Sequence, residues 1–216
     1  MIFPRSDSAV DPARRAVLAS LASFGLLAVT QGALKVHAAT NSDVIEMWLG
    51  SNDAVVEVRE YASMTCPHCA RFHENVYPEL KAEYIDTGKI RFVFREVYFD
   101  RSALWASMLA RCAGPTRYFS VIDLLFERQD DWSRQSDPVQ VTEQLFRIGR
   151  IAGMSDETIK SCMSDRDFAL AMIEKSDAER QGDNVNSTPN LVINGVNHGN
   201  LNYEKLKALI DDELGS

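Results

Sequence analysis

The hydrophobic pattern of the chain begins with an unbroken apolar run and becomes periodic only further on. Residues 16–29 (AVLASLASFGLLAV) are apolar and uncharged, and Arg14 and Arg15 precede them. Val36-His37-Ala38 then places small residues at the two positions that a signal peptidase reads. This layout predicts a signal peptide over residues 1–38, cleaved after Ala38.

The route of export and the removal of this segment each have an alternative. Arg14-Arg15 resembles a twin-arginine export signal, but the residues around the pair are incomplete for one, so the route stays open. An uncleaved membrane anchor is the alternative to cleavage. The apolar run is shorter than the ~20 residues that a membrane-spanning helix needs, which favours cleavage.

The pattern that follows is that of a strand, a helix and a second strand. Residues 55–61 (VVEVREY) alternate as a strand does, and residues 90–97 (IRFVFREV) predict another. Thr65-Cys66-Pro67 predicts a helix start, with Thr65 as the cap and Pro67 in the first turn. Apolar side chains then recur at helical spacing until Gly88, at Phe72, Val76, Leu80 and Tyr84. This order predicts a βαβ unit with parallel strands.

From about Asp100 to Gly182 the apolar spacing is helical and predicts five helices. Asp137 before Pro138, Ser155, and a capping box over residues 164–167 predict the starts of the third, fourth and fifth.

The end of the chain returns to β-structure. Residues 191–193 predict a strand, and Asn194-Gly195 is a strong hairpin-turn signal. Asn202 then caps a final amphipathic helix. The order βαβ, helical block, ββα predicts an α/β fold: a thioredoxin fold with an inserted all-helical domain. The core would comprise residues 39–99 and 183–216, and the insertion residues 100–182.

Composition and charge restrict the class of partner. The chain is 45% hydrophobic and 25% charged, as in soluble globular proteins. Its net charge of −8 becomes about −10 when residues 1–38, with four basic and two acidic residues, are removed. Such an acidic protein is unsuited to nucleic acid or an anionic membrane as its main partner.

The candidate chemistry lies in Cys66-Pro67-His68-Cys69. A CxxC pair at a helix start near a βαβ pattern predicts a redox site, because unpaired N–H groups and the helix dipole stabilise a thiolate there. His68 is expected to add positive charge or a hydrogen bond to the Cys66 sulfur. The alternatives are a purely structural bridge and a zinc site. Zinc lacks a second CxxC or HxxxH motif in this sequence.

Two further cysteines, Cys112 and Cys162, lie on apolar helical faces of the predicted insertion. An even cysteine count in an exported chain suggests disulfides, and a Cys66–Cys69 bridge leaves these two to pair. We expect a structural or redox-tuning disulfide. In the chain-entropy model its loop of roughly 50 residues would stabilise by about 4 kcal/mol. Two buried free thiols are the alternative.

Several stretches together resemble the bacterial DsbA family, and more narrowly its alphaproteobacterial members. They are residues 60–73 (EYASMTCPHCARFH), 94–96 (FRE), 105–115 (WASMLARCAGP) and 187–195 (STPNLVING). The resemblance implies that Cys66 is the exposed nucleophile and Cys69 the buried resolving thiol. It also implies that Thr188-Pro189 is a cis-proline loop that binds substrate peptide beside the sulfurs. An ordinary trans proline opening a strand is the alternative.

The resemblance suggests a proton-transfer role for Glu60, where the family places a partly buried acid. Alternation puts Glu60 on the same face as Val56, although a solvated strand-end glutamate fits equally well. His73, one helical turn after Cys69, is expected to have a packing or surface role rather than a catalytic one.

These observations predict an exported, periplasmic protein disulfide oxidoreductase, monomeric and without organic cofactor or metal. Its expected partners are reduced or unfolded exported proteins and, by the resemblance, a quinone-linked membrane re-oxidant similar to DsbB. Two alternatives remain: an isomerase or reductase with the same site, and a chaperone-like protein in which CPHC is only a structural bridge.

Overall fold

The computed structural model describes residues 44–215, so the predicted signal peptide lies outside the described residues. The strands are β1 (Met47–Gly50), β2 (Val56–Ala62), β3 (Ile90–Glu96), β4 (Asn190–Ile193) and β5 (Val196–Gly199). They form one five-stranded sheet in the order β1-β3-β2-β4-β5. The predicted parallel pairing of β2 with β3 is confirmed, and the other neighbours are antiparallel. β1, which was not predicted, is a short strand at the sheet edge.

Strands β2 and β3, in the interior of the sheet, are buried almost throughout, because helices cover the sheet on both faces. Val56, Val58 and Ala62 of β2 belong to the main hydrophobic core. Tyr61 points to the other face and joins a second cluster that includes Val185. By this alternation Glu60 lies on the face of the main core.

The prediction of a single helix between β2 and β3 is wrong in two respects, its continuity and its N-cap. The structure has α1 (Pro67–Asn75), α2 (Tyr77–Leu80) and a π-helical turn, η1 (Lys81–Ile85). Pro78 lacks the N–H that would continue the α1 ladder, and the helix breaks at Val76. The N-cap of α1 is Cys66, not Thr65, whose hydroxyl instead donates to Asp100 at 2.6 Å.

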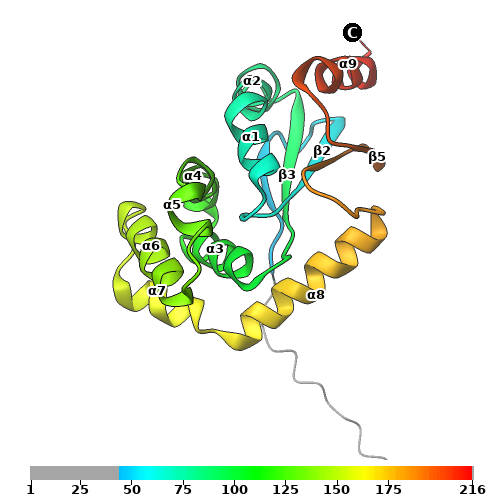
Figure 1. Cartoon of the computed structure of the whole chain (residues 1–216). Coiled ribbons are helices and arrows are strands. Elements are labelled where there is room, and N and C mark those ends of the chain that lie inside the picture. Colours follow the sequence, from blue (N-terminus) through cyan, green and yellow to red (C-terminus); the bar gives the residue numbers. More distant parts are fainter. Residues whose placement is uncertain (1–43, 216) are drawn as a thin grey trace, which may run out of the picture. The chain divides into compact units, whose positions relative to one another are not determined.

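The chain between β3 and β4 is helical, as Figure 1 shows. They are α3 (Arg101–Cys112), α4 (Pro115–Glu127), α5 (Gln129–Ser133), α6 (Pro138–Ile151), α7 (Asp156–Met163) and α8 (Arg166–Gly182). The predicted caps Asp137 and Ser155 are confirmed. The capping box for α8 is wrong, since Asp165 is the cap and accepts from Phe168 N. The short α5 was not predicted.

Glu96, at the end of β3, joins the sheet to these helices. Its carboxylate accepts two hydrogen bonds from the Arg111 guanidinium of α3, at 2.6 and 2.7 Å, and one from Tyr118 of α4 at 2.7 Å. Its carbonyl accepts from Ser176 of α8 at 2.7 Å. Both oxygens of this buried carboxylate therefore have donors in place of water.

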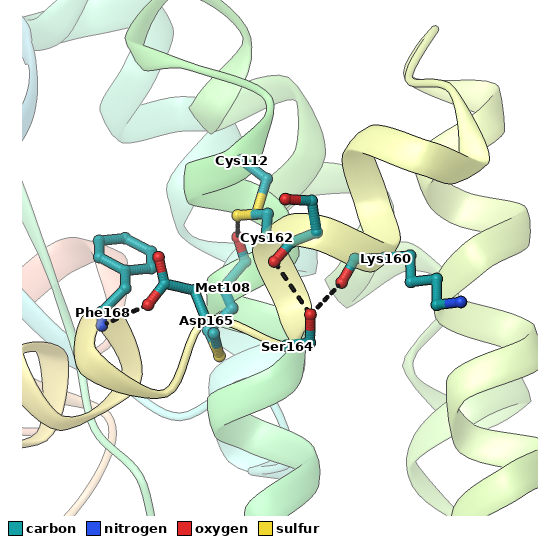
Figure 2. Close-up of a disulfide and its surroundings, with 8 residues drawn as sticks. Met108, Cys112, Lys160, Cys162, Ser164, Asp165 and Phe168 are labelled. Carbon is teal, nitrogen blue, oxygen red and sulfur yellow. Dashed lines mark hydrogen bonds between the residues drawn. A yellow bond between two sulfur atoms is a disulfide. The ribbon is translucent and has the colours of Figure 1, made fainter.

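A disulfide joins α3 to α7 through Cys112 and Cys162, whose Cα atoms lie 6.0 Å apart (Figure 2). The alternative of two free thiols is therefore wrong. The β4–β5 hairpin turns at Asn194-Gly195, both with positive φ, as predicted. α9 (Tyr203–Leu214) follows, capped by Asn202. Within residues 44–215, no helix has the length and apolarity needed to cross a membrane.

Candidate active site: a dithiol at the start of α1

The candidate site lies where the chain leaves β2 and enters α1. Cys66 is the N-cap residue of α1, and its carbonyl accepts from the backbone N–H groups of Cys69 and Ala70 at 3.1 and 3.2 Å. Cys66 is partly exposed, whereas Cys69, one turn later, is completely buried. Both thiols are free in this structure.

The surroundings stabilise a thiolate on Cys66. Its pKa is lowered to about 5, chiefly by a hydrogen bond from the Cys69 thiol. The Thr188 side chain and the backbone N–H groups of Cys69 and His68 act in the same direction, and partial burial opposes them. Donors at a helix start stabilise negative charge in this way.

Cys69 has the opposite character. Burial raises the pKa of its thiol, and the negative charges of Cys66 and Glu60 raise it further. At neutral pH the reduced site therefore holds one anionic, accessible sulfur beside one protonated, buried sulfur. Such a pair is suited to thiol–disulfide exchange, in which the accessible sulfur is attacked and later leaves.

The Thr188–Pro189 peptide bond is cis, so the trans alternative is wrong. The loop that carries it leads into β4 and lies against the dithiol: the Thr188 carbonyl oxygen is 3.6 Å from the Cys66 sulfur. The site is thus assembled from segments more than a hundred residues apart in the sequence.

The hydrogen bond expected from His68 to the Cys66 sulfur comes from its backbone N–H, while its ring contacts Arg71. Its Nδ1 lies 2.7 Å from Nη2 of Arg71, which can only donate, so Nδ1 accepts. The backbone N–H of His68 is the part of this residue that lowers the Cys66 pKa. Pro67 occupies the first position of α1, where its missing N–H costs no helical hydrogen bond.

Behind Cys69 lies a buried acid–imidazole pair that the sequence did not predict. Glu60 is completely buried, so the solvated alternative is wrong, and its Oε2 lies 2.9 Å from Nε2 of His73. The His73 ring is also buried, stacked on Phe126 at 4.2 Å and near Tyr77 at 4.6 Å between ring centroids. A packing role for His73 thus holds, but the ring also carries a polar contact.

A groove of about 660 Å³ runs from the start of α1 toward α4 and α5. Pro67, His73, Tyr77 and Phe126 are among the residues that line it. His73 thereby connects the buried carboxylate of Glu60 to this groove. Among the described residues there is no group of three or more potential metal ligands.

Gln129 of α5 is a further site residue that the sequence analysis missed. Its side-chain amide donates to the carbonyls of Met64 and Cys66, at 2.8 and 3.0 Å. No spacing rule identifies such a residue, because it lies sixty or more positions from the cysteines. Cys112 and Cys162, by contrast, are bonded to each other and are not among the main groups that shift the Cys66 pKa.

Comparisons with known proteins agree with this geometry. A family model described as thioredoxin matches residues 42–212. A putative protein-disulfide oxidoreductase of Rickettsia bellii is 37% identical over 173 residues, covering 80% of this chain and 66% of the relative. Disulfide bond formation protein D of Bacillus subtilis is 30% identical over 175 residues, covering 77% and 76%. The chain spans only 60–66% of the length of the rickettsial relatives.

Solved structures show the same fold. Alpha-DsbA1 of Wolbachia pipientis superposes with a TM-score of 0.73 at 28% identity, covering 79% of this chain and 91% of that one. BdbD of Bacillus subtilis, in its oxidised form, superposes with a TM-score of 0.70 at 24% identity, covering 79% and 94%. With its family model matched over most of its length and its dithiol at the head of α1, the chain belongs to the thioredoxin family, in the DsbA-like branch.

Proposed function

We propose that this protein is an exported thiol–disulfide oxidoreductase that introduces disulfide bonds into other exported proteins through Cys66 and Cys69. The observation that carries the proposal is the asymmetry of the two sulfurs at the start of α1. One is accessible with a pKa lowered to about 5, and the other is buried with a raised pKa. The names of the relatives and of alpha-DsbA1 support the same chemistry.

The reaction would proceed by two exchanges. A substrate thiolate attacks the Cys66 sulfur of the oxidised protein; the Cys66–Cys69 bond breaks, a mixed disulfide forms, and Cys69 leaves and takes up a proton. A second substrate thiolate then attacks the first substrate sulfur, and Cys66 leaves as a thiolate. Two electrons pass from the substrate to the protein. Stabilising the Cys66 thiolate favours the reduced protein, so the oxidised form acts as an oxidant.

The cis-proline loop would hold the substrate during the first exchange. The Thr188 carbonyl lies beside the Cys66 sulfur, where an extended peptide could donate a backbone N–H to it. Pro189 has no N–H that would compete for the sulfur. We therefore retain Thr188 and Pro189 as the substrate-binding residues.

Glu60 and His73 would move the proton that Cys69 gains and loses. Cys69 is completely buried, so its proton cannot exchange directly with water. Glu60 lies close enough to raise the Cys69 pKa, and His73 contacts both Glu60 and the groove. The pair provides a route from the buried thiol to the groove.

The proposed setting follows from the branch of the family. A DsbA-like protein acts in the periplasm on reduced exported proteins and is re-oxidised by a quinone-linked partner similar to DsbB. Residues 1–38 would direct export and be removed after Ala38. We also propose that the protein acts as a monomer and that residues 100–182 form an inserted helical domain.

The test compares oxidation of a reduced model protein with refolding of a scrambled one. The proposal predicts faster oxidation than rearrangement, loss of both activities in Cys66→Ala, and mixed disulfides with exported proteins accumulating in Cys69→Ala. The double variant C112A/C162A is the matched control, because it removes two cysteines and leaves the dithiol. Faster rearrangement would indicate an isomerase, and absence of trapped partners would support the chaperone-like alternative.

A further inference from the structure

The side chain of Gln129 joins the helical segment to the loop that carries Cys66. Gln129 is the first residue of α5 and is buried, with 4% of its surface exposed. Its Nε2 donates to the Met64 carbonyl at 2.8 Å and to the Cys66 carbonyl at 3.0 Å. Both donors of one amide therefore bind the backbone on either side of Thr65. Neither backbone carbonyl can donate to the amide oxygen of Gln129, so the amide nitrogen must be the atom that faces them.

These two bonds fix the peptide groups around the nucleophilic residue. The Cys66 carbonyl belongs to the Cys66–Pro67 peptide and also accepts the first bonds of α1, from Cys69 and Ala70. The Met64 carbonyl belongs to the peptide before Thr65. With both peptide planes held, rotation of the backbone at Cys66 is restricted.

Gln129 is itself held firmly by its helix. Trp132 of α5 is completely buried, and its indole N–H donates to the Leu125 carbonyl at 2.9 Å. A buried amide on an anchored helix loses little further conformational entropy when it binds the loop.

We propose that Gln129 is a positioning residue, through which the segment 100–182 holds the Cys66 sulfur against the donors at the start of α1. The inference rests on the proposed exchange function and deepens it, because it gives the helical segment a direct role at the site. The N–H groups of His68 and Cys69 reach the sulfur only while the backbone at Cys66 keeps its observed conformation. Hydrogen bonds weaken steeply with distance and angle, so a small rotation would weaken this stabilisation of the thiolate.

The test replaces Gln129 with residues of similar size that donate no hydrogen bond. Gln129→Met removes the donors, and Gln129→Glu opposes the two carbonyls with a carboxylate. Thiolate absorbance of the reduced, full-length protein is titrated, and equilibrium with glutathione is measured. We expect Gln129→Met to reduce the ionisation constant of Cys66 about tenfold and to shift the glutathione equilibrium about tenfold toward the oxidised protein. Gln129→Glu should have a larger effect in the same direction.

Matched controls separate positioning from stability. Gln135→Met alters a partly exposed glutamine that donates to the Asp131 carbonyl, and it should change neither measurement. Should both Gln129 variants fail to fold, Gln129→Asn keeps the amide but is too short to reach both carbonyls, and it should show a smaller shift.

The possible outcomes are distinct. Unchanged Cys66 ionisation in folded Gln129 variants, with equal loss of stability in the oxidised and reduced proteins, would overturn the inference and leave a merely structural glutamine. If the wild-type protein oxidised no substrate but Gln129→Met still shifted the ionisation, the positioning role would stand and the proposed function would fail.

Discussion

At the scale of single residues, the site depends on how burial divides two identical side chains. Cys66 and Cys69 are three positions apart, yet one is partly exposed among donors and the other is completely buried. Glu60 and His73 form the next layer: both are buried polar side chains, joined by one contact between Oε2 and Nε2, while Oε1 and Nδ1 have no partner. The chemistry of the site therefore comes from environment more than from residue type.

The buried pair leads to a prediction about rate. Replacing Glu60 with Gln should slow attack by Cys69 on a Cys66 mixed disulfide by about a hundredfold, the lower range for a positioned acid–base group. The measurement is single-turnover release of a chromophoric thiol from that mixed disulfide, across pH. Glu74→Gln, on an exposed position of α1, serves as the control and should react normally. Equal rates in the two variants would argue against the proton route.

At the scale of elements, the helices are attached to the sheet by polar as well as apolar contacts. Glu96, at the end of β3, accepts hydrogen bonds from α3, α4 and α8, and the Cys112–Cys162 disulfide joins α3 to α7. Gln129 adds a contact from α5 to the start of α1. Apart from the contact between β3 and α3, these contacts join elements that are not consecutive in the sequence.

The Glu96 cluster gives a stability prediction. Arg111→Met leaves a buried carboxylate without its cation and should lower the free energy of unfolding by roughly 3–5 kcal/mol. Denaturant unfolding measures this value. Arg150→Met is the matched control, since Arg150 makes an equally close bidentate pair with Asp156 that is exposed, and it should change little. Similar losses of unfolding free energy in the two variants would mean that burial of the ion pair does not determine its contribution to stability.

Removing the Cys112–Cys162 disulfide should lower the stability of the protein without abolishing thiol–disulfide exchange. The sequence separation of the two cysteines is 50 residues, and C112A/C162A should lower the free energy of unfolding by about 4 kcal/mol in the chain-entropy model. Denaturant unfolding and the glutathione equilibrium are measured together. A changed equilibrium with unchanged stability would favour the redox-tuning role over the structural one.

At the scale of the whole molecule, oxidation state and stability are linked through Cys66. A thiol whose pKa falls to about 5 on folding stabilises the reduced protein fully only above the unfolded pKa, ~8.5. That stabilisation declines as pH falls and is lost below about 5. The oxidised protein has no thiolate at this site and lacks the contribution.

The stability of the reduced protein relative to the oxidised protein should therefore fall as the pH is lowered from 8 to 5. In this range Cys69 stays protonated in the folded state and is largely protonated in the unfolded state, so Cys66 dominates the change. Unfolding of both forms at a series of pH values measures it. The stability of reduced Cys66→Ser, which lacks the titrating thiol, should show a weaker dependence; the same dependence in this variant would refute the assignment to Cys66.

Local signals were sufficient for the parts of the fold that short-range physics controls. The strands β2 and β3, the caps Asp137 and Ser155, and the Asn194-Gly195 turn follow from periodicity and backbone preference within a few residues. The parallel pairing of the two strands follows from the βαβ order. The errors lie where local signals compete. At the start of α1, for example, the Thr65 hydroxyl binds Asp100 instead of capping the helix.

The sequence by itself determined that a CxxC dithiol opens a helix after a strand, because that arrangement is encoded by adjacent residues. The family resemblance of residues 187–195 already implied that the Thr188-Pro189 loop lies beside the sulfurs. Only the tertiary structure decided the other groups around the dithiol, the Glu60–His73 pair and the Gln129 amide. These groups come from distant segments, and burial and hydrogen-bond geometry depend on how those segments pack. Residue spacing along the chain carries no information about such contacts.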